Sequence, residues 1–337
     1  MNNLNFDVVT GETIRSFLDD SYSEVMRIVR ETYLLHEQGL TNNPDSYFLR
    51  FDDKPEARII ALPAAKQGAD AVAGIKWIAS YPKNVANNLQ RASATILLNN
   101  YETGYPFALL EASQISAFRT AASAVLAANT LKNNHKVARK IAFVGAGIIA
   151  RKIADFFRSE EWAIGEISAY DLNSHDAEKF SHYIKSTHTC ESIAENSLDA
   201  AIREADIIVF ATNAGVPYVT DFNMIKKNQI VLNISLRDIS PEIILNSANI
   251  FDDVEHCMKA NTSPHLAEQL SGGRSFVDGT LAGLIRGEVK IRSDCPVIFS
   301  PFGLGVLDLV IAAHLYRCAV QKKRSYSIPG FFPDMSR

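Results

Sequence analysis

Residues 141–150 read Ile-Ala-Phe-Val-Gly-Ala-Gly-Ile-Ile-Ala, and this stretch decides the fold of the chain. Its first four residues form an unbroken apolar run, which is typical of a strand buried in a parallel sheet. Gly145, Gly147 and Ala150 follow with the spacing Gly-x-Gly-x-x-Ala, just before a predicted helix at 148–159. The first glycine permits a tight turn, the second lets the backbone approach a pyrophosphate, and the alanine allows close packing. This context predicts a dinucleotide-binding fold, and a simple strand–helix turn is the alternative.

Asp171 closes the next predicted strand, at 166–170. A carboxylate in this position would accept hydrogen bonds from both ribose hydroxyls and would repel a 2′-phosphate. Residues 172–174 contain no arginine that could hold such a phosphate, so NAD is favoured over NADP. The alternative role for Asp171 is that of a helix cap or turn residue. The residues expected to contact the cofactor are Gly145, Gly147, Ile148, Ile149, Asp171, Thr212, Asn213, Ser235 and Gly303.

Further apolar runs at 207–210 and 230–233 continue the alternation of strand and helix. Such alternation predicts a Rossmann-type, doubly wound parallel sheet of the α/β class. We expect this NAD-binding domain to span residues 132–303.

The remainder of the chain, residues 1–131 and 304–337, is expected to form an α+β substrate-binding domain. Short apolar runs bounded by Gly, Pro and Asn indicate strands, and longer runs without Gly or Pro indicate helices. The expected strands are 58–63, 71–79 and 94–99, with a hairpin between 94–98 and 107–111 that turns at 103–106. The expected helices are 21–35, 116–131 and 306–321, the last packed back on this domain.

Composition excludes several classes of function. Of the 337 residues, 47% are hydrophobic and 21% are charged, and the formal net charge is −4, so nucleic acid is not an expected partner. No apolar stretch reaches the roughly 20 residues of a membrane helix, and the N-terminus lacks an apolar leader, so we expect a cytoplasmic protein. The four cysteines form no Cys-x-x-Cys pair and are expected to be reduced thiols. His256 and Cys257 adjoin three acidic residues, but without a second ligand cluster no metal is expected.

Four charged residues are candidates for the chemistry. Arg58, Lys76 and Arg119 stand among apolar neighbours, where a cation is costly unless it is paired. They fit either structural salt bridges and snorkelling side chains or a carboxylate-binding pocket. Asp238 follows the strand at 230–234, at the sheet edge where ligands bind in open α/β folds. It could be a general base for water or a simple turn former.

At this point the residues resemble the ornithine cyclodeaminase/mu-crystallin family over nearly the whole chain, including residues 301–308. The strings that recur in the same order are Gly74-Ile75-Lys76-Trp77, Arg91-Ala92-Ser93-Ala94 leading to Leu98-Asn99, Glu111-Ala112-Ser113, Ile115-Ser116, Arg119-Thr120-Ala121-Ala122 and the Gly145 fingerprint. The segments 102–106 (Glu-Thr-Gly-Tyr-Pro) and 233–235 (Asn-Ile-Ser) are similar to the branch of the family that makes 2,3-diaminopropionate.

The resemblance implies roles for individual residues. Arg58, Lys76 and Arg119 match positions that bind substrate carboxylate, Asp238 matches the acidic base, and Lys76 is also expected to take part in catalysis. Family members are homodimers formed by the non-Rossmann domains, so the first domain is also an expected dimerisation domain. In one departure, ornithine cyclodeaminases place Pro-Gly-Lys shortly after the acid, whereas residues 239–242 here read Ile-Ser-Pro-Glu. The missing lysine argues against ornithine cyclisation.

The implied reaction is NAD-dependent oxidative hydrolysis of N-(2-amino-2-carboxyethyl)-L-glutamate to L-2,3-diaminopropionate, 2-oxoglutarate and NADH. It would supply a siderophore or peptide-antibiotic pathway, with a functional link to an upstream pyridoxal-phosphate-dependent synthase. The alternatives are an ornithine cyclodeaminase, an imine or ketimine reductase, and a non-catalytic binding protein of the mu-crystallin kind. Retention of Asp238 and the three cations argues against the last of these.

Overall fold

The computed structural model describes residues 5–333, so the outermost residues of the expected substrate-binding domain, 1–4 and 334–337, lie outside the described residues. The chain divides into two compact units. The first unit consists of the residues up to Arg119 and those from Leu304 onward, and the second unit is Thr120–Gly303. The domain boundary expected at residue 131 coincides with the end of helix α3 (Ser113–Leu131). The boundary between the two units lies after Arg119, inside this unbroken helix.

The first unit contains a mostly antiparallel sheet, in which only β1 and β7 pair in parallel. Its strands, in spatial order, are β16 (Tyr326–Ile328), β1 (Phe6–Val9), β7 (Pro106–Glu111), β6 (Ala92–Asn99), β5 (Val72–Ser80), β4 (Arg58–Lys66) and β2 (Thr41–Asn42), with β3 (Tyr47–Arg50) also paired to β4. The structure contains the strands predicted at 58–63, 71–79 and 94–99 and the hairpin that joins β6 to β7.

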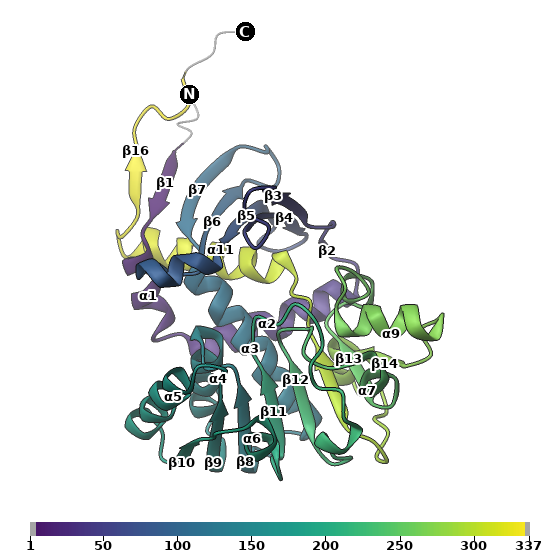
Figure 1. Cartoon of the computed structure of the whole chain (residues 1–337). Coiled ribbons are helices and arrows are strands. Elements are labelled where there is room, and N and C mark those ends of the chain that lie inside the picture. The colour runs from purple at the N-terminus through teal and green to yellow at the C-terminus, as the bar shows by residue number, and fades with distance from the viewer. Residues whose placement is uncertain (1–4, 334–337) are drawn as a thin grey trace. The chain divides into compact units, whose positions relative to one another are not determined.

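Helix α11 (Gly305–Gln321) covers one face of this sheet and packs on β4, β5 and β6 (Figure 1). Apolar residues predominate in this helix, and most of its residues are buried. Two further helices, α1 (Gly11–Leu18) and α2 (Tyr22–Glu37), contact α11. A short 3₁₀ turn, η1 (Pro82–Asn87), connects β5 to β6. Helix α11 therefore belongs to the first unit.

The second unit contains a sheet in which every strand pairing is parallel. Its strands, in spatial order, are β10 (Glu191–Ala194), β9 (Ala163–Tyr170), β8 (Val137–Val144), β11 (Ile207–Phe210), β12 (Ile230–Asn233), β15 (Val297–Ser300), β13 (Ala248–Phe251) and β14 (Val277–Thr280). From β10 to β12 the order is that of the Rossmann fold, with β8 at the switch point. The predicted α/β fold class is confirmed.

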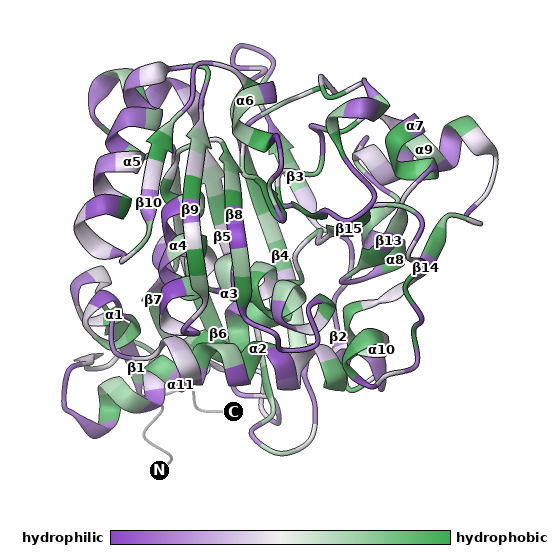
Figure 2. Cartoon of the chain, turned by 90° about the horizontal axis from the view of Figure 1, so that it is seen from below, coloured by the Kyte–Doolittle hydropathy of each residue, from purple (hydrophilic) through white to green (hydrophobic). Residues whose placement is uncertain are grey.

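Helices flank the parallel sheet and bury one apolar stripe each. In α4, Ala150, Ile153, Phe156 and Phe157 are all buried. Figure 2 shows that α5 carries many hydrophilic residues, whereas hydrophobic residues predominate along the strands beside it. The helices of this unit are α4 (Ile148–Ser159), α5 (Ser174–Thr187), α6 (Leu198–Ile202), α7 (Pro241–Leu245), α8 (Val254–Cys257), α9 (Ser263–Ser271) and α10 (Leu281–Ile285), with a 3₁₀ turn η2 (Phe222–Met224).

Within residues 5–333, no helix is both long enough and apolar enough to cross a membrane. In the same range, no group of three or more His, Cys, Asp or Glu side chains is placed to hold a metal ion. The four cysteines are unpaired.

Candidate active site

The glycine loop between β8 and α4 is shaped for close approach of a ligand. Gly145 has a φ of +92°, and a Cβ on it would lie 2.5 Å from the carbonyl oxygen of Ala211, so only glycine fits. Gly147 precedes α4 as its N-cap, has no side chain to cap the helix, and leaves open space where a Cβ would stand. The backbone N–H groups of the first turn of α4 can therefore donate to an anion such as a pyrophosphate. These residues fit a dinucleotide.

The two glycines give a matched pair of variants. We expect Gly145→Ala to lower the free energy of unfolding by about 1–3 kcal/mol, because the new side chain meets backbone in a left-handed conformation. Gly147→Ala should change it by less than about 0.5 kcal/mol, since nothing lies within 4 Å of the new Cβ. Both should raise the Kd for NAD at least tenfold in calorimetric titration. An unchanged Kd in Gly147→Ala would contradict the placement of the pyrophosphate at this loop.

Asp171 follows β9 and ties the glycine loop to the neighbouring strand. Its Oδ2 accepts a hydrogen bond from the Ala146 backbone N–H at 2.9 Å, and its Oδ1 accepts one from Asn173 N–H at 3.0 Å. The carboxylate is half-buried and keeps lone pairs that a ribose hydroxyl could use. Ile148 and Ile149 begin α4 beside it, and the Ile148 side chain is 58% exposed.

Asp238 lies at the same carboxyl edge of the sheet as the glycine loop, in the turn after β12. It is fully buried, and the turn includes Leu236 in the left-handed region, with φ +68°. The Thr212 hydroxyl donates to Asp238 Oδ1 at 2.5 Å, and the Ser235 hydroxyl donates to Oδ2. Thr212 follows β11, so the ends of two adjacent strands fix the orientation of one carboxylate. Asn213, the next residue along, is exposed.

Tyr218 is a third hydroxyl on Asp238, and the sequence analysis did not single it out. Its Oη donates to Asp238 Oδ1 at 3.0 Å, and its backbone N–H donates to the Asp238 carbonyl oxygen at the same distance. Burial and the nearby carboxylate raise the pKa of Tyr218, so the phenol stays protonated and remains a donor. Tyr218 is 41% exposed, whereas Asp238 is fully buried, so Tyr218 links the buried carboxylate to the solvent-facing surface.

Gly303 is held by a buried carboxylate from another loop. Asp252 accepts hydrogen bonds from the backbone N–H groups of Phe302 and Gly303 at 2.8 and 2.7 Å. Burial raises the pKa of Asp252, and these backbone donors oppose that rise. The Cys257 thiol also donates to Asp252, at 3.4 Å. Asp252 and Cys257 therefore hold the backbone turn that contains Gly303.

In the first unit, Lys76 and Arg119 share a carboxylate that the sequence analysis did not identify. Asp308, on α11, lies 2.6 Å from Lys76 Nζ and 3.2 Å from Arg119 Nε. Lys76 also donates to the Ser116 hydroxyl at 3.2 Å. Lys76 and Asp308 are fully buried, whereas the Arg119 side chain is 13% exposed. Two cations and one carboxylate leave a net charge of +1, which suits the binding of one substrate carboxylate.

The protonation of Lys76 should set an alkaline limit on activity. Burial lowers its pKa to about 8, although Asp308 opposes this shift and Arg119 reinforces it. Below this pH the ammonium attracts a carboxylate, and above it the charge is lost. We therefore expect kcat/KM to fall as pH rises through about 8. In Lys76→Arg the side chain stays charged, so the fall in kcat/KM should move to higher pH. If the fall stays near the same pH, a group other than Lys76 causes it.

Arg58 does not join the Lys76 cluster. It opens β4 and pairs across the sheet with Ser80, four residues along β5 from Lys76. Its Nε is buried without a hydrogen-bond partner. Arg91, just before β6, reaches the same place, because its Nη1 donates to the Ser80 hydroxyl at 3.0 Å. The carboxylate pocket predicted for Arg58, Lys76 and Arg119 stays a prediction, in which only Lys76 and Arg119 share a recorded partner.

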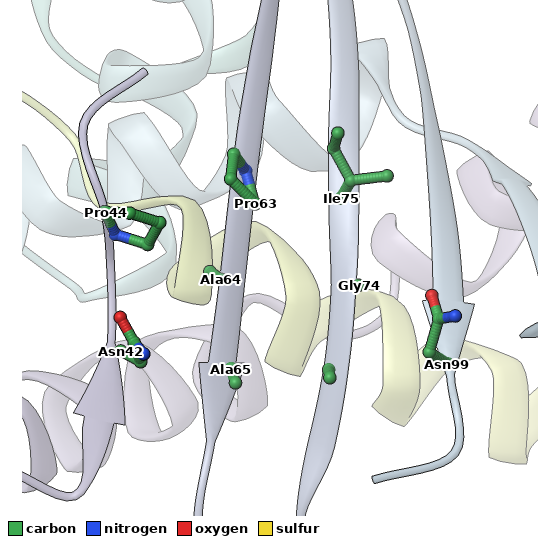
Figure 3. Close-up of a pocket in the computed structure, with 9 residues that line it drawn as sticks. Asn42, Pro44, Pro63, Ala64, Ala65, Gly74, Ile75 and Asn99 are labelled. Atoms are coloured by element: carbon green, nitrogen blue, oxygen red, sulfur yellow. The ribbon is translucent and has the colours of Figure 1, made fainter. Parts of the chain in front are cut away.

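A hollow of about 360 Å³ lies on the sheet of the first unit, and Figure 3 shows its lining on β2, β4, β5 and β6. The residues that line it are Asn42, Pro44, Pro63, Ala64, Ala65, Ala73, Gly74, Ile75 and Asn99. None of them titrates, and Ile75 neighbours Lys76 on β5, where successive side chains point to opposite faces. The hollow therefore has no acid or base for catalysis.

The model of the ornithine cyclodeaminase/mu-crystallin family matches residues 13–323. The chain belongs to the ornithine cyclodeaminase/mu-crystallin family. The family resemblance predicted from the sequence is thus confirmed.

Relatives within the ornithine cyclodeaminase/mu-crystallin family have several activities. N-((2S)-2-amino-2-carboxyethyl)-L-glutamate dehydrogenase of Staphylococcus aureus (strain NCTC 8325 / PS 47) is 29% identical over 271 residues, which cover 79% of this chain and 80% of the relative. Alanine dehydrogenase of Archaeoglobus fulgidus is 28% identical over 341 residues, covering 96% and 98%. A solved archaeal alanine dehydrogenase dimer with bound NAD superposes with a TM-score of 0.85 at 26% identity, covering 97% and 100% of the two chains.

Proposed function

We propose that this chain is an NAD-dependent oxidoreductase that oxidises the CH–NH bond of N-(2-amino-2-carboxyethyl)-L-glutamate and releases L-2,3-diaminopropionate and 2-oxoglutarate. One observation carries the proposal: an open glycine loop and an oriented, buried Asp238 lie at the same carboxyl edge of the parallel sheet. The relative from S. aureus supports the choice of substrate. So does the sequence Ile-Ser-Pro-Glu after Asp238, which lacks the lysine expected of an ornithine cyclodeaminase.

The cofactor would be held by the carboxyl edge of the second unit. Gly145, Gly147 and the first turn of α4 would take the pyrophosphate, and Asp171 would take the adenosine ribose. Ile148 and Ile149 at the start of α4 would complete the contacts, together with four residues that follow strands: Thr212, Asn213, Ser235 and Gly303. Bound NAD supplies the hydride acceptor, and the protein supplies position and shielding.

Side chains of the protein would bind the substrate and transfer protons. Lys76 and Arg119 bind a substrate carboxylate and fix the glutamate α-carbon, and such orientation lowers a barrier by several kcal/mol. Loss of the hydride leaves a carbon–nitrogen double bond at that carbon. Asp238 accepts a proton from water as the water oxygen bonds to the imine carbon. The carbinolamine then breaks its carbon–nitrogen bond, the amine takes up a proton, and a ketone remains as 2-oxoglutarate.

The choice of NAD over NADP would depend on Asp171. We expect Asp171→Asn to lower the ratio of kcat/KM for NAD to that for NADP at least tenfold, because repulsion of the 2′-phosphate is removed. Asp176→Asn, which changes a nearby half-exposed carboxylate in the first turn of α5, is the matched control and should leave the ratio unchanged. An unchanged ratio in Asp171→Asn would show that this carboxylate does not meet the ribose.

Isotope transfer tests the proposed reaction. The conjugate is made with deuterium on the glutamate α-carbon and incubated with NAD and the enzyme. We expect deuterated NADH and 2-oxoglutarate in equal amounts. Deuterium that returns to an amino-acid product would instead indicate an internal cycle of oxidation and reduction, and absence of transfer would refute the oxidoreductase assignment.

We also propose that the enzyme is a homodimer, as the archaeal alanine dehydrogenase structure is. The uncovered face of the first unit's sheet supports this, because Trp77 on β5 is 42% exposed and Tyr47 on β3 is 73% exposed. Light scattering should give a mass of twice 37.2 kDa. A cytoplasmic location and a pyridoxal-phosphate-dependent synthase upstream belong to the same proposal.

A further inference from the structure

Hydroxyl groups surround the Asp238 carboxylate, and one of them belongs to an exposed side chain. Asp238 Oδ1 accepts hydrogen bonds from the Thr212 hydroxyl at 2.5 Å and from Tyr218 Oη at 3.0 Å, and Oδ2 accepts one from the Ser235 hydroxyl. Asp238 is fully buried, Thr212 and Ser235 are half-buried, and Tyr218 is 41% exposed. Tyr218 is therefore the most exposed of the three groups through which a proton can leave the carboxylate.

The hydroxyls of Thr212 and Ser235 each have a second partner in the backbone. The Thr212 hydroxyl accepts a hydrogen bond from the Ala214 N–H at 3.1 Å, and the Ser235 hydroxyl lies 3.0 Å from the Phe210 carbonyl oxygen as a donor. These contacts hold the ends of β11 and β12 together around the carboxylate. Thr212 and Ser235 therefore orient Asp238, and proton transfer is a role that suits Tyr218.

Backbone hydrogen bonds fix the position of Tyr218 beside Asp238. The N–H groups of Tyr218 and Val219 both donate to the Asp238 carbonyl oxygen, at 3.0 and 2.9 Å. The Ser240 N–H donates to the Val219 carbonyl oxygen at 2.9 Å, and Val219 forms a β-bridge with Ile239. The loop after β11 is thus tied to the turn after β12 on both sides of Asp238. The phenol is held next to the carboxylate in advance, so it needs no rearrangement during a reaction.

The direction of the hydrogen bond between Tyr218 and Asp238 depends on which of them is protonated. Burial and the charge of Asp238 raise the pKa of Tyr218, so the phenol donates to the carboxylate at neutral pH. A carboxylic acid is itself a donor, and a phenol oxygen has lone pairs that accept. Once Asp238 holds a proton, the hydrogen bond can reverse, and the Tyr218 O–H is then directed to another acceptor.

We propose that Tyr218 gives a proton to the departing amine and receives one from Asp238. This inference rests on the proposed function and deepens it, because it names the proton donor for cleavage of the carbon–nitrogen bond. An amine leaves a carbinolamine readily once its nitrogen is protonated, and a positioned acid speeds this step. The proton that Asp238 has taken from water is the supply, and Tyr218 delivers it from the buried network.

The protons and electrons of these steps balance. Loss of hydride leaves a protonated imine, and Asp238 takes a proton from water as the water oxygen bonds to the imine carbon. The Tyr218 Oη–H bond then breaks as its proton passes to the carbinolamine nitrogen, and the proton on Asp238 passes to Tyr218 Oη. The carbon–nitrogen bond breaks with its electron pair going to nitrogen, and the hydroxyl proton passes to Asp238 as the carbonyl forms. Asp238 finally releases that proton to solvent, and nothing is oxidised or reduced after the hydride has left.

Tyr218→Phe removes the phenol proton and keeps the ring. In the full-length enzyme with NAD and the conjugate, we expect kcat to fall about tenfold, while KM and the Kd for NAD stay within twofold. Tyr183→Phe is the matched control, because Tyr183 Oη also donates to a buried carboxylate, Asp155 Oδ1, at 2.5 Å. Asp155 and Tyr183 lie within α4 and α5 rather than in the loops around Asp238, so all three values should stay within twofold.

Chemical rescue of Tyr218→Ala separates proton donation from a structural role. This variant removes an exposed ring and leaves space for a small aromatic molecule. We expect millimolar phenol to raise its kcat at least fivefold. Anisole, which has the same ring and oxygen but no acidic proton, should leave kcat within twofold. Neither compound should change wild type or Tyr218→Phe, in which a ring already fills the space.

Rescue by phenol and anisole alike, or by neither, would overturn the proposal, because the tyrosine would then fill space or orient Asp238. A wild-type kcat in Tyr218→Phe would overturn it as well. Wild-type enzyme that forms no NADH from the conjugate contradicts the proposed function instead. The variants are then assayed with L-alanine, because an alanine dehydrogenase is among the relatives, and the same pattern of rescue is expected with ammonia as the departing amine. If wild type oxidises neither compound, both proposals fail.

Discussion

Asp238→Asn is expected to lower kcat for the conjugate by about 10²–10⁴-fold, the range lost when a general base is removed. Asparagine keeps the size of the side chain and can still hydrogen-bond Thr212 and Tyr218, but it cannot accept a proton from water. The buried carboxylate is oriented by three hydroxyls, which makes it the best-placed base at the carboxyl edge of the second unit.

The measurement is single-turnover kinetics with NAD and the conjugate, together with calorimetric titration of NAD. We expect the Kd for NAD to stay within twofold, because the glycine loop is unchanged. Tyr218→Phe removes only one of the three donors and should cause an intermediate loss of about tenfold. If Asp238→Asn turned over at the wild-type rate, Asp238 would be a turn-forming residue, and another group would activate water.

The second large effect concerns stability. Asp308→Leu is expected to lower the free energy of unfolding by about 3–5 kcal/mol, because it leaves the fully buried Lys76 without its carboxylate. The double variant Lys76→Met/Asp308→Leu should recover at least half of that loss, since neither buried charge then remains. It should nevertheless be inactive, because Lys76 is proposed to bind the substrate carboxylate.

Urea unfolding at pH 7 measures both effects. Asp199→Asn is the matched control, because it breaks an ion pair with Arg203 in which both side chains are more than half exposed, and it should cost less than about 1 kcal/mol. A loss of less than 1 kcal/mol for Asp308→Leu, or a double variant no more stable than the single one, would contradict the buried pair.

The features predicted well from sequence are those in which neighbouring residues carry the signal. The apolar strand, the two glycines and the helix at 148–159 form one continuous pattern, so the fold of the second unit could be read directly. The hairpin of β6 and β7 was equally local, because a turn that contains Gly104 and Pro106 separates two apolar runs. By contrast, β1 and β16 have four and three residues, too few for a recognisable pattern.

The site residues that sequence reasoning missed act through long-range contacts. Asp308 lies 232 residues from Lys76 in the chain, and no spacing rule links them. A usable signal was present, however, because Asp308 is the only carboxylate in a mostly apolar helix, and Lys76 is the only charge in an apolar strand. Asp252 offered no such signal, because its partners are backbone N–H groups. Strand register, which the sequence does not specify, places Arg58 opposite Ser80 on the sheet that also carries Lys76, and the pocket predicted for both cations stays a prediction.

One measurement tests the central claim most directly: NADH absorbance with purified enzyme and NAD, with the conjugate in one cuvette and ornithine in another. The account predicts one NADH and one 2-oxoglutarate for each conjugate consumed, and no reaction with ornithine. Proline and ammonia formed from ornithine without net NADH would contradict it and would make this enzyme a cyclodeaminase.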